Sequence, residues 1–218
     1  MLLYDFLAPA YDPALESVYR PFRTRALGLL PARAGASVLD LACGTGQNFP
    51  LLAGRLGGQG KIIGVDISSG MLLRARRRAE RARLPNVSLV EMNAARLSPA
   101  TLEAGTDLCA VDCVVCTYGF TAMREWEDAF WSSWNLLKPG GGYLIHDIDG
   151  VAGSFHSFAV ELATRCDFSK SVWKPLQTVA ADFRMDYIDP SAHLFGGRLF
   201  VAYGTKPSAS MRPTSCLF

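Results

Sequence analysis

The sequence predicts an α/β fold: a mostly parallel seven-stranded sheet with a C-terminal antiparallel hairpin and an N-terminal helical lid. Three observations predict it. Apolar runs alternate with amphipathic segments from residue 36 onward, a glycine turn follows the first run, and the last two runs are joined too closely for a crossover helix. We expect a lid over residues 1–35, an α/β domain over 36–206 and a flexible tail over 207–218.

The parallel part of the sheet is predicted from five short apolar runs. The expected strands are 36–41, 61–66, 87–91, 111–117 and 142–148. The amphipathic segments between them are the expected helices, at 46–56, 69–83, 99–104 and 124–137. Strands that alternate with helices are joined by right-handed crossovers, so these strands should lie parallel.

The two ends of the chain depart from that alternation. Four prolines break the apolar start, which predicts two short helices near 13–20 and 21–30. At the other end we expect a helix near 153–166 and an irregular segment to about residue 180. The runs at 182–188 and 198–205 should then pair as an antiparallel hairpin on the sheet edge.

Composition limits the classes of function. The net charge of +2 over 218 residues gives no argument for nucleic acid, and no apolar run approaches the ~20 residues of a membrane span. The start of the chain lacks the pattern of a signal peptide, so we expect a cytoplasmic protein with reduced cysteines.

Three of the six cysteines have the spacing of iron–sulfur ligands: Cys109, Cys113 and Cys116. Cys113 and Cys116 lie within a predicted strand, however, and a spacing of three points them to opposite faces of the sheet. Three thiolates that bind one cluster must converge. We therefore predict that Cys113 and Cys116 are buried core cysteines and that the three cysteines hold no metal.

Six arginines gather within residues 74–83, on the helix predicted after Asp66. One interpretation is the solvated face of an ordinary helix. The other is a surface for anionic lipid headgroups or an acidic partner, which would make the protein peripheral to a membrane.

The stretch from Val38 to Asn48 predicts a nucleotide-like ligand. An apolar strand ends at Asp40, and a turn with Gly44 and Gly46 leads into a helix, which brings backbone N–H groups close to a ligand. A second strand ends in Asp66, 20 residues after Gly46, where an acid can hold the two hydroxyls of a ribose.

The identity of that ligand follows from what the turn lacks and what it carries. Phe49 stands where a dinucleotide site has its third glycine, and Asp40 would place a negative charge beside a pyrophosphate. A cationic ligand with an ammonium group suits Asp40 better. S-adenosylmethionine has both a sulfonium and an α-amino group.

At this point the chain resembles the class I S-adenosylmethionine-dependent methyltransferases, which have a Rossmann-like fold, from about residue 4 to residue 206. Five segments carry the resemblance in the family's order: 38–46, 63–72, 92–94, 112–119 and 136–143. The opening Tyr4–Asp12 and the ending Gly196–Lys206 are similar to the ubiquinone/menaquinone biosynthesis C-methyltransferases and to bacterial phospholipid N-methyltransferases. The family usually has an aspartate where this chain has Asn93.

The resemblance implies a set of residues that bind S-adenosylmethionine. Asp40 would hold the methionine ammonium, Asp66 the ribose, and Asn93 the adenine edge. The full set of expected cofactor residues is Tyr11, Asp40, Ala42, Gly44, Gly46, Asp66, Ile67, Met71, Asn93, Ala94, Thr117 and Tyr118. For the two acids the alternative is helix capping, and for Tyr11 it is simple packing within the lid.

The sequence gives fewer signals for the site of the methyl acceptor. In-line methyl transfer depends on positioning and on the exclusion of water more than on side-chain chemistry. His146 and Asp147, at the end of the fifth strand, are the catalytic candidates, with Asp149 and His193 more remote. His146 also fits a histidine of the crevice wall. Phe120 and Phe155 are the expected lining of an apolar acceptor pocket.

These observations together predict a methyltransferase with a small apolar or lipidic acceptor, such as a quinone precursor methylated at carbon or oxygen. A phospholipid N-methyltransferase is the alternative within the enzymes. A protein that binds S-adenosylmethionine without catalysis is the alternative of another class. A nicotinamide oxidoreductase is disfavoured by the missing glycine, and no motif of nucleic-acid methyltransferases follows the fourth strand.

Overall fold

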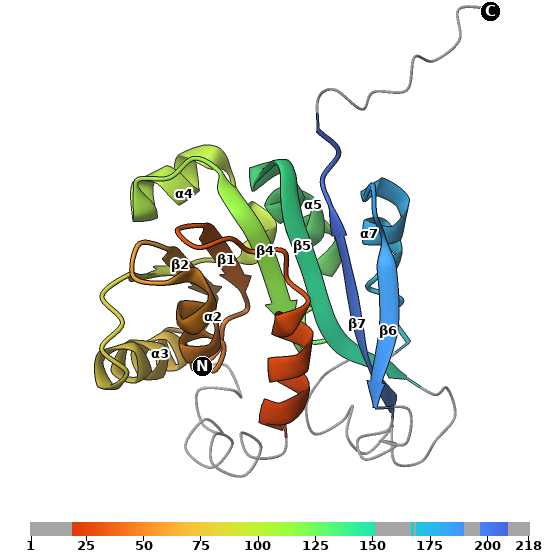
Figure 1. The fold of residues 1–218 in the computed structure, drawn as a ribbon, viewed down its shortest axis with the longest axis horizontal. Helices are drawn as coiled ribbons and strands as arrows, with labels where there is room; N and C mark the ends of the chain where they lie inside the picture. Colours follow the sequence, from red (N-terminus) through yellow and green to blue (C-terminus); the bar gives the residue numbers. More distant parts are fainter. Residues whose placement is uncertain (1–18, 151–166, 168, 190–196, 209–218) are drawn as a thin grey trace, which may run out of the picture.

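The computed structural model describes residues 19–150, 167, 169–189 and 197–208, and within them seven strands form one sheet (Figure 1). The strands are β1 (Ser37–Leu41), β2 (Lys61–Asp66), β3 (Val87–Glu91), β4 (Val111–Thr117), β5 (Leu137–Gly150), β6 (Arg184–Asp189) and β7 (Gly197–Thr205). Their order in the sheet is β3-β2-β1-β4-β5-β7-β6. β1 to β5 pair in parallel, whereas β7 pairs antiparallel with both β5 and β6. The predicted fold class is confirmed.

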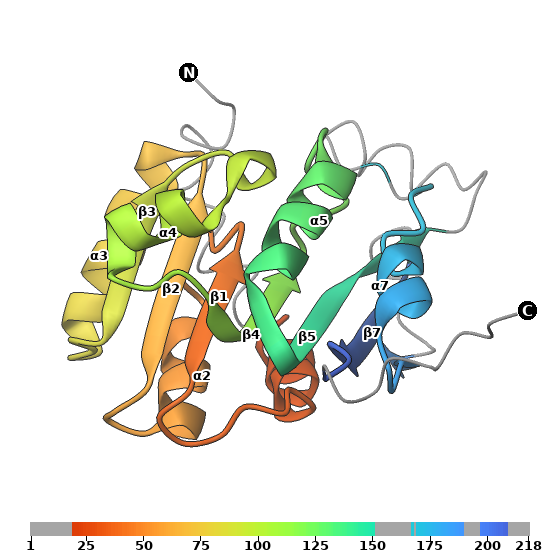
Figure 2. The ribbon, with the colours of Figure 1, turned by 90° about the horizontal axis from the view of Figure 1, so that it is seen from above.

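Helices cover both faces of the sheet. They are α2 (Phe49–Leu56), α3 (Ser69–Arg81), the 3-10 helix η1 (Ala94–Arg96), α4 (Pro99–Thr106), α5 (Trp126–Leu136) and α7 (Lys174–Val179), with a further helix over residues 19–28. Seen along the sheet, α4, α5 and α7 lie on one side, and α2 and the helix over 19–28 lie on the other (Figure 2).

Each face of the sheet has its own apolar core because side chains alternate along a strand. One core joins the strands to α2, α3 and the helix over 19–28, and the other joins them to α4, α5 and α7. Cys113 belongs to the first core and Cys116 to the second. The two thiols therefore lie on opposite faces, as their spacing predicted.

The first helix of the domain begins later than predicted, at Phe49 rather than residue 46. Gly46 has φ +76, outside the helical region, and Asn48 is the N-cap residue. The ring of Phe49 packs where Cβ atoms would stand on Gly46 and Gly64, at 2.5 and 2.8 Å from the nearest ring atoms. A glycine on β2 thus accommodates the bulky residue that replaces the third glycine of a dinucleotide turn.

Other boundaries also differ from prediction. The helix over 19–28 continues through Pro21, where two helices were expected to meet. β5 starts at Leu137 rather than 142, and Gly140 and Gly141 exchange backbone bonds with Lys206. α7 lies within a segment predicted to be irregular. The helix expected near 153–166 lies outside the described residues.

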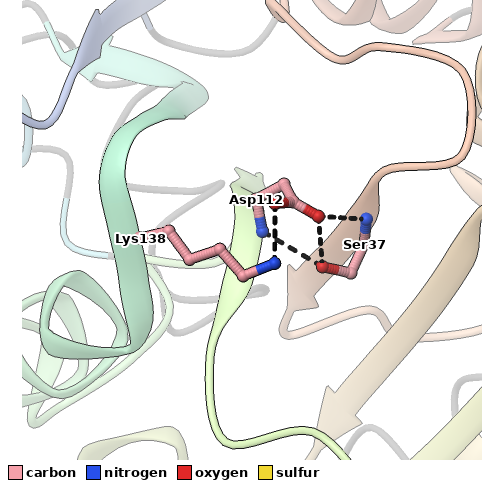
Figure 3. Close-up of polar contacts among 3 residues, drawn as sticks. All are labelled: Ser37, Asp112 and Lys138. Atoms are coloured by element: carbon pink, nitrogen blue, oxygen red, sulfur yellow. Dashed lines mark hydrogen bonds and ion pairs between the residues drawn. The ribbon is translucent and has the colours of Figure 1, made fainter.

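A polar cluster joins three strands at the end of the sheet where β1 and β4 begin (Figure 3). Asp112 accepts bonds from the backbone N and the Oγ of Ser37, at 2.8 and 2.7 Å, and Lys138 Nζ lies 2.7 Å from its other oxygen. Burial alone would raise the pKa of Asp112, but the bonds from Lys138 and Ser37 lower it below its ordinary value. This cluster stabilises the edge of the sheet opposite the predicted site.

Candidate functional site

The carboxyl ends of β1, β2, β4 and β5 bring most of the predicted residues to one edge of the sheet. This edge of an open parallel sheet is where ligands bind. The helix over 19–28 lies across the carboxyl end of β4 (Figure 1), and its Arg23 reaches the side chain of Thr117. The site is therefore formed by strand ends on one side and this helix on the other.

The turn after β1 has an open backbone. Ala42, Gly44 and Gly46 all have positive φ values, of 48, 54 and 76 degrees. A Cβ added to Gly44 would meet no atom within 4 Å. Gly44 N donates to Asp66 Oδ2 at 2.8 Å, and Ser68 N donates to Asp66 Oδ1 at 2.9 Å. Asp66 thus ties the turn to the end of β2.

Asp40 is a buried carboxylate beneath this turn. Its side chain has no exposed surface, and Asn48 Nδ2 donates to its Oδ1 at 2.8 Å. Burial raises its pKa to about 7, although the bond from Asn48 and the charge of Arg23 lower it in part. Among the buried side chains of the described residues, Asp40 Oδ2 is one of two polar atoms without a hydrogen-bond partner. Such an atom indicates a position for a missing donor.

Arg23 brings a positive charge to the same place. Its Nη1 donates to Thr117 Oγ1 at 2.8 Å and to Asn48 Oδ1 at 3.2 Å, and its Nη2 donates to Gln47 Oε1 at 2.7 Å. The side chain is only 8% exposed. Arg23, Gln47, Asn48, Thr117 and Asp40 therefore form one network that links the helix over 19–28 to β1 and β4.

Tyr118 and His146 form a hydrogen-bonded pair beside that network. The Tyr118 hydroxyl lies 2.6 Å from His146 Nε2, and His146 Nδ1 lies 2.7 Å from the carbonyl oxygen of Phe200. A carbonyl only accepts, so Nδ1 carries the proton and Nε2 accepts from Tyr118. Burial lowers the pKa of His146 to about 4, so the ring is neutral. Tyr118 has φ +56, a strained value for a tyrosine, of the kind found at functional positions.

Asp147 and Phe120, which were also predicted on the acceptor side, lie in the interior. Asp147 Oδ1 accepts from Thr121 Oγ1 at 2.7 Å and from Ile148 N at 2.9 Å, and burial raises its pKa to about 6. These bonds hold the turn after β4 against β5. Phe120 is fully buried and packs its ring near Trp126 and Phe130. Both side chains have packing partners in the protein.

The predicted adenine residues surround the ends of β2 and β3. Ile67 is 56% exposed, an unusual position for a large apolar side chain, whereas Met71 and Ala94 are buried. Asn93 stands at the start of η1, where its Oδ1 accepts from Ala95 N at 3.0 Å. Its Nδ2 donates to Glu125 Oε2 at 2.6 Å.

Other predicted residues lie apart from this edge or outside the described residues. Tyr11, Phe155 and His193 lie outside them. Asp149 accepts from Tyr187 Oη at 2.6 Å, and Arg198 stacks 3.4 Å above the ring of Tyr187, within the pairing of β5, β7 and β6.

The helix rich in arginine is α3, which starts beside the site. Arg78 Nε donates to the carbonyl of Thr45 at 2.9 Å, so one arginine supports the glycine turn. Arg76, Arg77 and Arg81 are exposed. None of the helices in the described part of the chain has the length and apolar content needed to cross a membrane.

Sequence reasoning missed Arg23 and Glu125. Arg23 stands on a proline-flanked helix 17 residues before Asp40, so spacing does not connect the two. Glu125 stands 32 residues after Asn93 on another element. Gln47 and Asn48 lie directly after Gly46, and their polarity at a helix start was the available signal.

The comparison with protein families gives a match over residues 38–141 to the methyltransferase domain. The chain is 28% identical to 2-phytyl-1,4-naphtoquinone methyltransferase of Thermosynechococcus vestitus, over 66% of this chain and 62% of that protein. It is 31% identical to the ubiquinone/menaquinone biosynthesis C-methyltransferase of Yersinia pestis, over 65% of this chain and 53% of that protein. The matched part is less than two thirds of the length of each relative.

Solved structures share the fold. A SAM-dependent methyltransferase from Aquifex aeolicus superposes with a TM-score of 0.62 at 17% identity, covering 94% of this chain and 100% of that one. The [4+2]-cyclase SpnF superposes with a TM-score of 0.74 at 14% identity, covering 94% of both chains. At these identities the likeness concerns the fold alone, and a fold does not determine the reaction.

Proposed function

We propose that the protein transfers a methyl group from S-adenosylmethionine to a small apolar or lipidic acceptor, such as a quinone-precursor ring; the match of residues 38–141 to the methyltransferase domain supports this. The observation that carries the proposal is the buried Asp40 with its unpartnered oxygen, next to a glycine turn with open backbone. The names of the two relatives support a quinone-like acceptor, and one of them names methylation at carbon.

The methionine end of the cofactor fits the network around Asp40. Asp40 Oδ2 is an acceptor without a donor, and an ammonium group supplies one. Arg23 is a donor beside it and would bind the carboxylate of the same amino acid. Gly44 leaves room for the cofactor, Ala42 and Gly46 flank it in the same turn, and Thr117 lines the strand end. When bound, S-adenosylmethionine supplies a methyl group activated by a sulfonium.

The adenosine end fits the ends of β2 and β3. Asp66 would accept bonds from both ribose hydroxyls. The exposed Ile67 would lie against the adenine ring, which removes its apolar surface from water, with Met71 beneath. Asn93 and Ala94 would meet the edge of the base.

On the acceptor side we assign the contact to Tyr118, which the sequence placed among the cofactor residues, and the positioning to His146. The Tyr118 hydroxyl donates its proton to the neutral His146 ring. Its oxygen can therefore accept a hydrogen bond from the methyl-accepting substrate. It can orient a hydroxyl of the acceptor without becoming charged. We give Asp147 and Phe120 a supporting role, because both are buried and partnered.

Phospholipid N-methylation is the second candidate. It is supported by the exposed arginines of α3, since anionic headgroups attract such a surface. Flotation with anionic vesicles at low salt that vanishes at high salt would favour it. From another class, a protein that binds the cofactor without turnover also fits, because a fold does not determine the reaction.

The test is transfer of tritium-labelled methyl groups from S-adenosylmethionine to a whole-cell extract, followed by separation of organic and aqueous phases. We expect label in the organic phase, and none with the Asp40→Asn variant as control. Label in neither phase, together with measurable cofactor binding, would support the binder without turnover.

A further inference from the structure

The amide of Asn93 has one orientation in this structure. Its Oδ1 accepts from the backbone N–H of Ala95 at 3.0 Å, and its Nδ2 lies 2.6 Å from the Glu125 carboxylate. An N–H needs an acceptor and a carboxylate needs a donor, so both partners require the same orientation. The Asn93 oxygen is therefore bonded to the backbone, and its NH2 group points toward Glu125.

Glu125 is held in place by the packing of its helix. It is the N-cap residue of α5, yet its side chain makes no capping bond to its own helix. α5 is anchored beside η1, since Ser132 Oγ donates to the carbonyl of Ala95 at 3.0 Å. The Glu125 carboxylate instead accepts a hydrogen bond from Asn93 on the neighbouring element.

We propose that the Glu125 carboxylate accepts a hydrogen bond from the 6-amino group of adenine, and so replaces the carboxylate that an aspartate at position 93 would provide. The inference rests on the proposed function, because it takes S-adenosylmethionine to bind with its base at the end of β3. A 6-amino group donates two N–H bonds and needs acceptors. A carboxylate offers about four lone-pair sites, and the bond from Asn93 occupies one of them. Asn93 thus positions the acid, and Glu125 selects adenine over a 6-oxo purine.

The experiment measures binding of two ligands to the full chain by calorimetry. S-adenosylhomocysteine carries the 6-amino group, and S-inosylhomocysteine carries a carbonyl oxygen instead. We expect Glu125→Gln to weaken binding of the adenosyl ligand about tenfold and to change binding of the inosyl ligand less than twofold. Glu127→Gln removes an exposed carboxylate from the first turn of the same helix and serves as the matched control.

A rescue separates the role of the charge from a loss of packing. In the double variant Asn93→Asp with Glu125→Gln, the carboxylate introduced on η1 can still accept from Ala95 N and offers a second, free oxygen to the base. Affinity for the adenosyl ligand should therefore return to within about threefold of wild type. Equal losses for both ligands, or no loss with Glu125→Gln, would overturn the inference. Absence of binding by the wild-type chain would overturn the proposed function as well.

Discussion

Asp40 is the residue in which stability and binding oppose each other. Burial raises the pKa of its carboxyl to about 7, so the folded protein binds its proton more tightly than the unfolded chain, whose pKa is about 4. The folded state therefore holds more protons between these two values. Its free energy of unfolding must fall as pH rises from about 4 to about 7 and stay low above that range. A bound ammonium group would offset that cost.

Replacing Asp40 with Asn should separate the two effects. We subtract the free energy of unfolding of wild type from that of Asp40→Asn at each pH. This difference should be about 2–3 kcal/mol larger at pH 8 than at pH 5, because only wild type loses stability as Asp40 ionises. The same variant should bind S-adenosylhomocysteine at least tenfold more weakly. Urea unfolding at the two pH values measures the first, and calorimetry the second. A pH-independent difference in stability would contradict the assignment of a buried, ionising Asp40.

The Tyr118 hydroxyl should matter for turnover and not for cofactor binding. We expect Tyr118→Phe to lower kcat about tenfold while S-adenosylhomocysteine affinity stays within twofold. It also leaves His146 Nε2 without its donor, which should cost about 1–3 kcal/mol of stability. Tyr143→Phe is the control, because the Tyr143 hydroxyl bonds Ser133 in the core, 2.7 Å away. An equal loss of kcat in both variants would argue against a role for Tyr118 at the site.

For individual residues, the sequence predicted the position of those site residues that lie at the ends of apolar runs. Asp40 is the last but one residue of β1 and Asp66 is the last residue of β2, so their place at one sheet edge followed from the pattern. Arg23 and Glu125 could not be predicted, because each reaches the site from a separate helix and no local spacing records such a contact. Asp147 was predicted at the correct edge, but strand alternation gives no bonding partner, and Thr121 supplies one.

In the turn between β1 and α2, the two glycines Gly44 and Gly46 have different structural roles. Gly46 has φ +76 and no room for a Cβ, which would lie 2.5 Å from the Phe49 ring. Gly44 has φ +54 and open space where a Cβ would stand. One glycine is therefore required for packing, and the other keeps the ligand side of the turn clear.

Alanine at the two positions should have contrasting effects. We expect Gly46→Ala to lower the free energy of unfolding by about 2–4 kcal/mol, and Gly44→Ala by only about 1 kcal/mol. Gly44→Ala should instead weaken S-adenosylhomocysteine binding tenfold or more. Thermal melting and calorimetry on both proteins give the comparison. Tight binding by Gly44→Ala would show that the cofactor does not approach this backbone.

Strand positions were predicted better than helix ends. The expected ranges 61–66, 87–91 and 111–117 are those of β2, β3 and β4, because a strand in a parallel sheet appears as a short apolar run between polar residues. The start of α2 depends on the φ of Gly46 and the contacts of Asn48, which apolar periodicity does not report. α7 has six residues, too few for a helical period to show.

For the whole molecule, the two ends of the sheet have separate roles. The Ser37–Asp112–Lys138 cluster joins β1, β4 and β5 at the end opposite the site (Figure 3). We expect Asp112→Asn to lower Tm by a few degrees and to leave S-adenosylhomocysteine affinity unchanged. Because the folded pKa of Asp112 is lowered, its contribution is present at neutral pH and is lost as pH falls through the acid range. An affinity loss would contradict the separation of the two ends.

The fold class was predictable because strands that alternate with helices form a parallel sheet. The identity of the methyl acceptor could not be predicted, because methyl transfer requires little covalent chemistry from the protein. Its pocket depends on apolar surfaces, and these resemble core packing in a sequence. Phe120 illustrates the difficulty: it was expected in the acceptor pocket, and its ring packs in the core near Trp126.

The most direct test of the central claim, that Asp40 and Asp66 hold an adenosylated amino acid at the glycine turn, is calorimetric titration of the full chain with S-adenosylhomocysteine. We predict binding by wild type and a loss of at least tenfold when either acid is replaced by its amide. No heat with the wild-type chain, or unchanged binding after both replacements, would contradict the account.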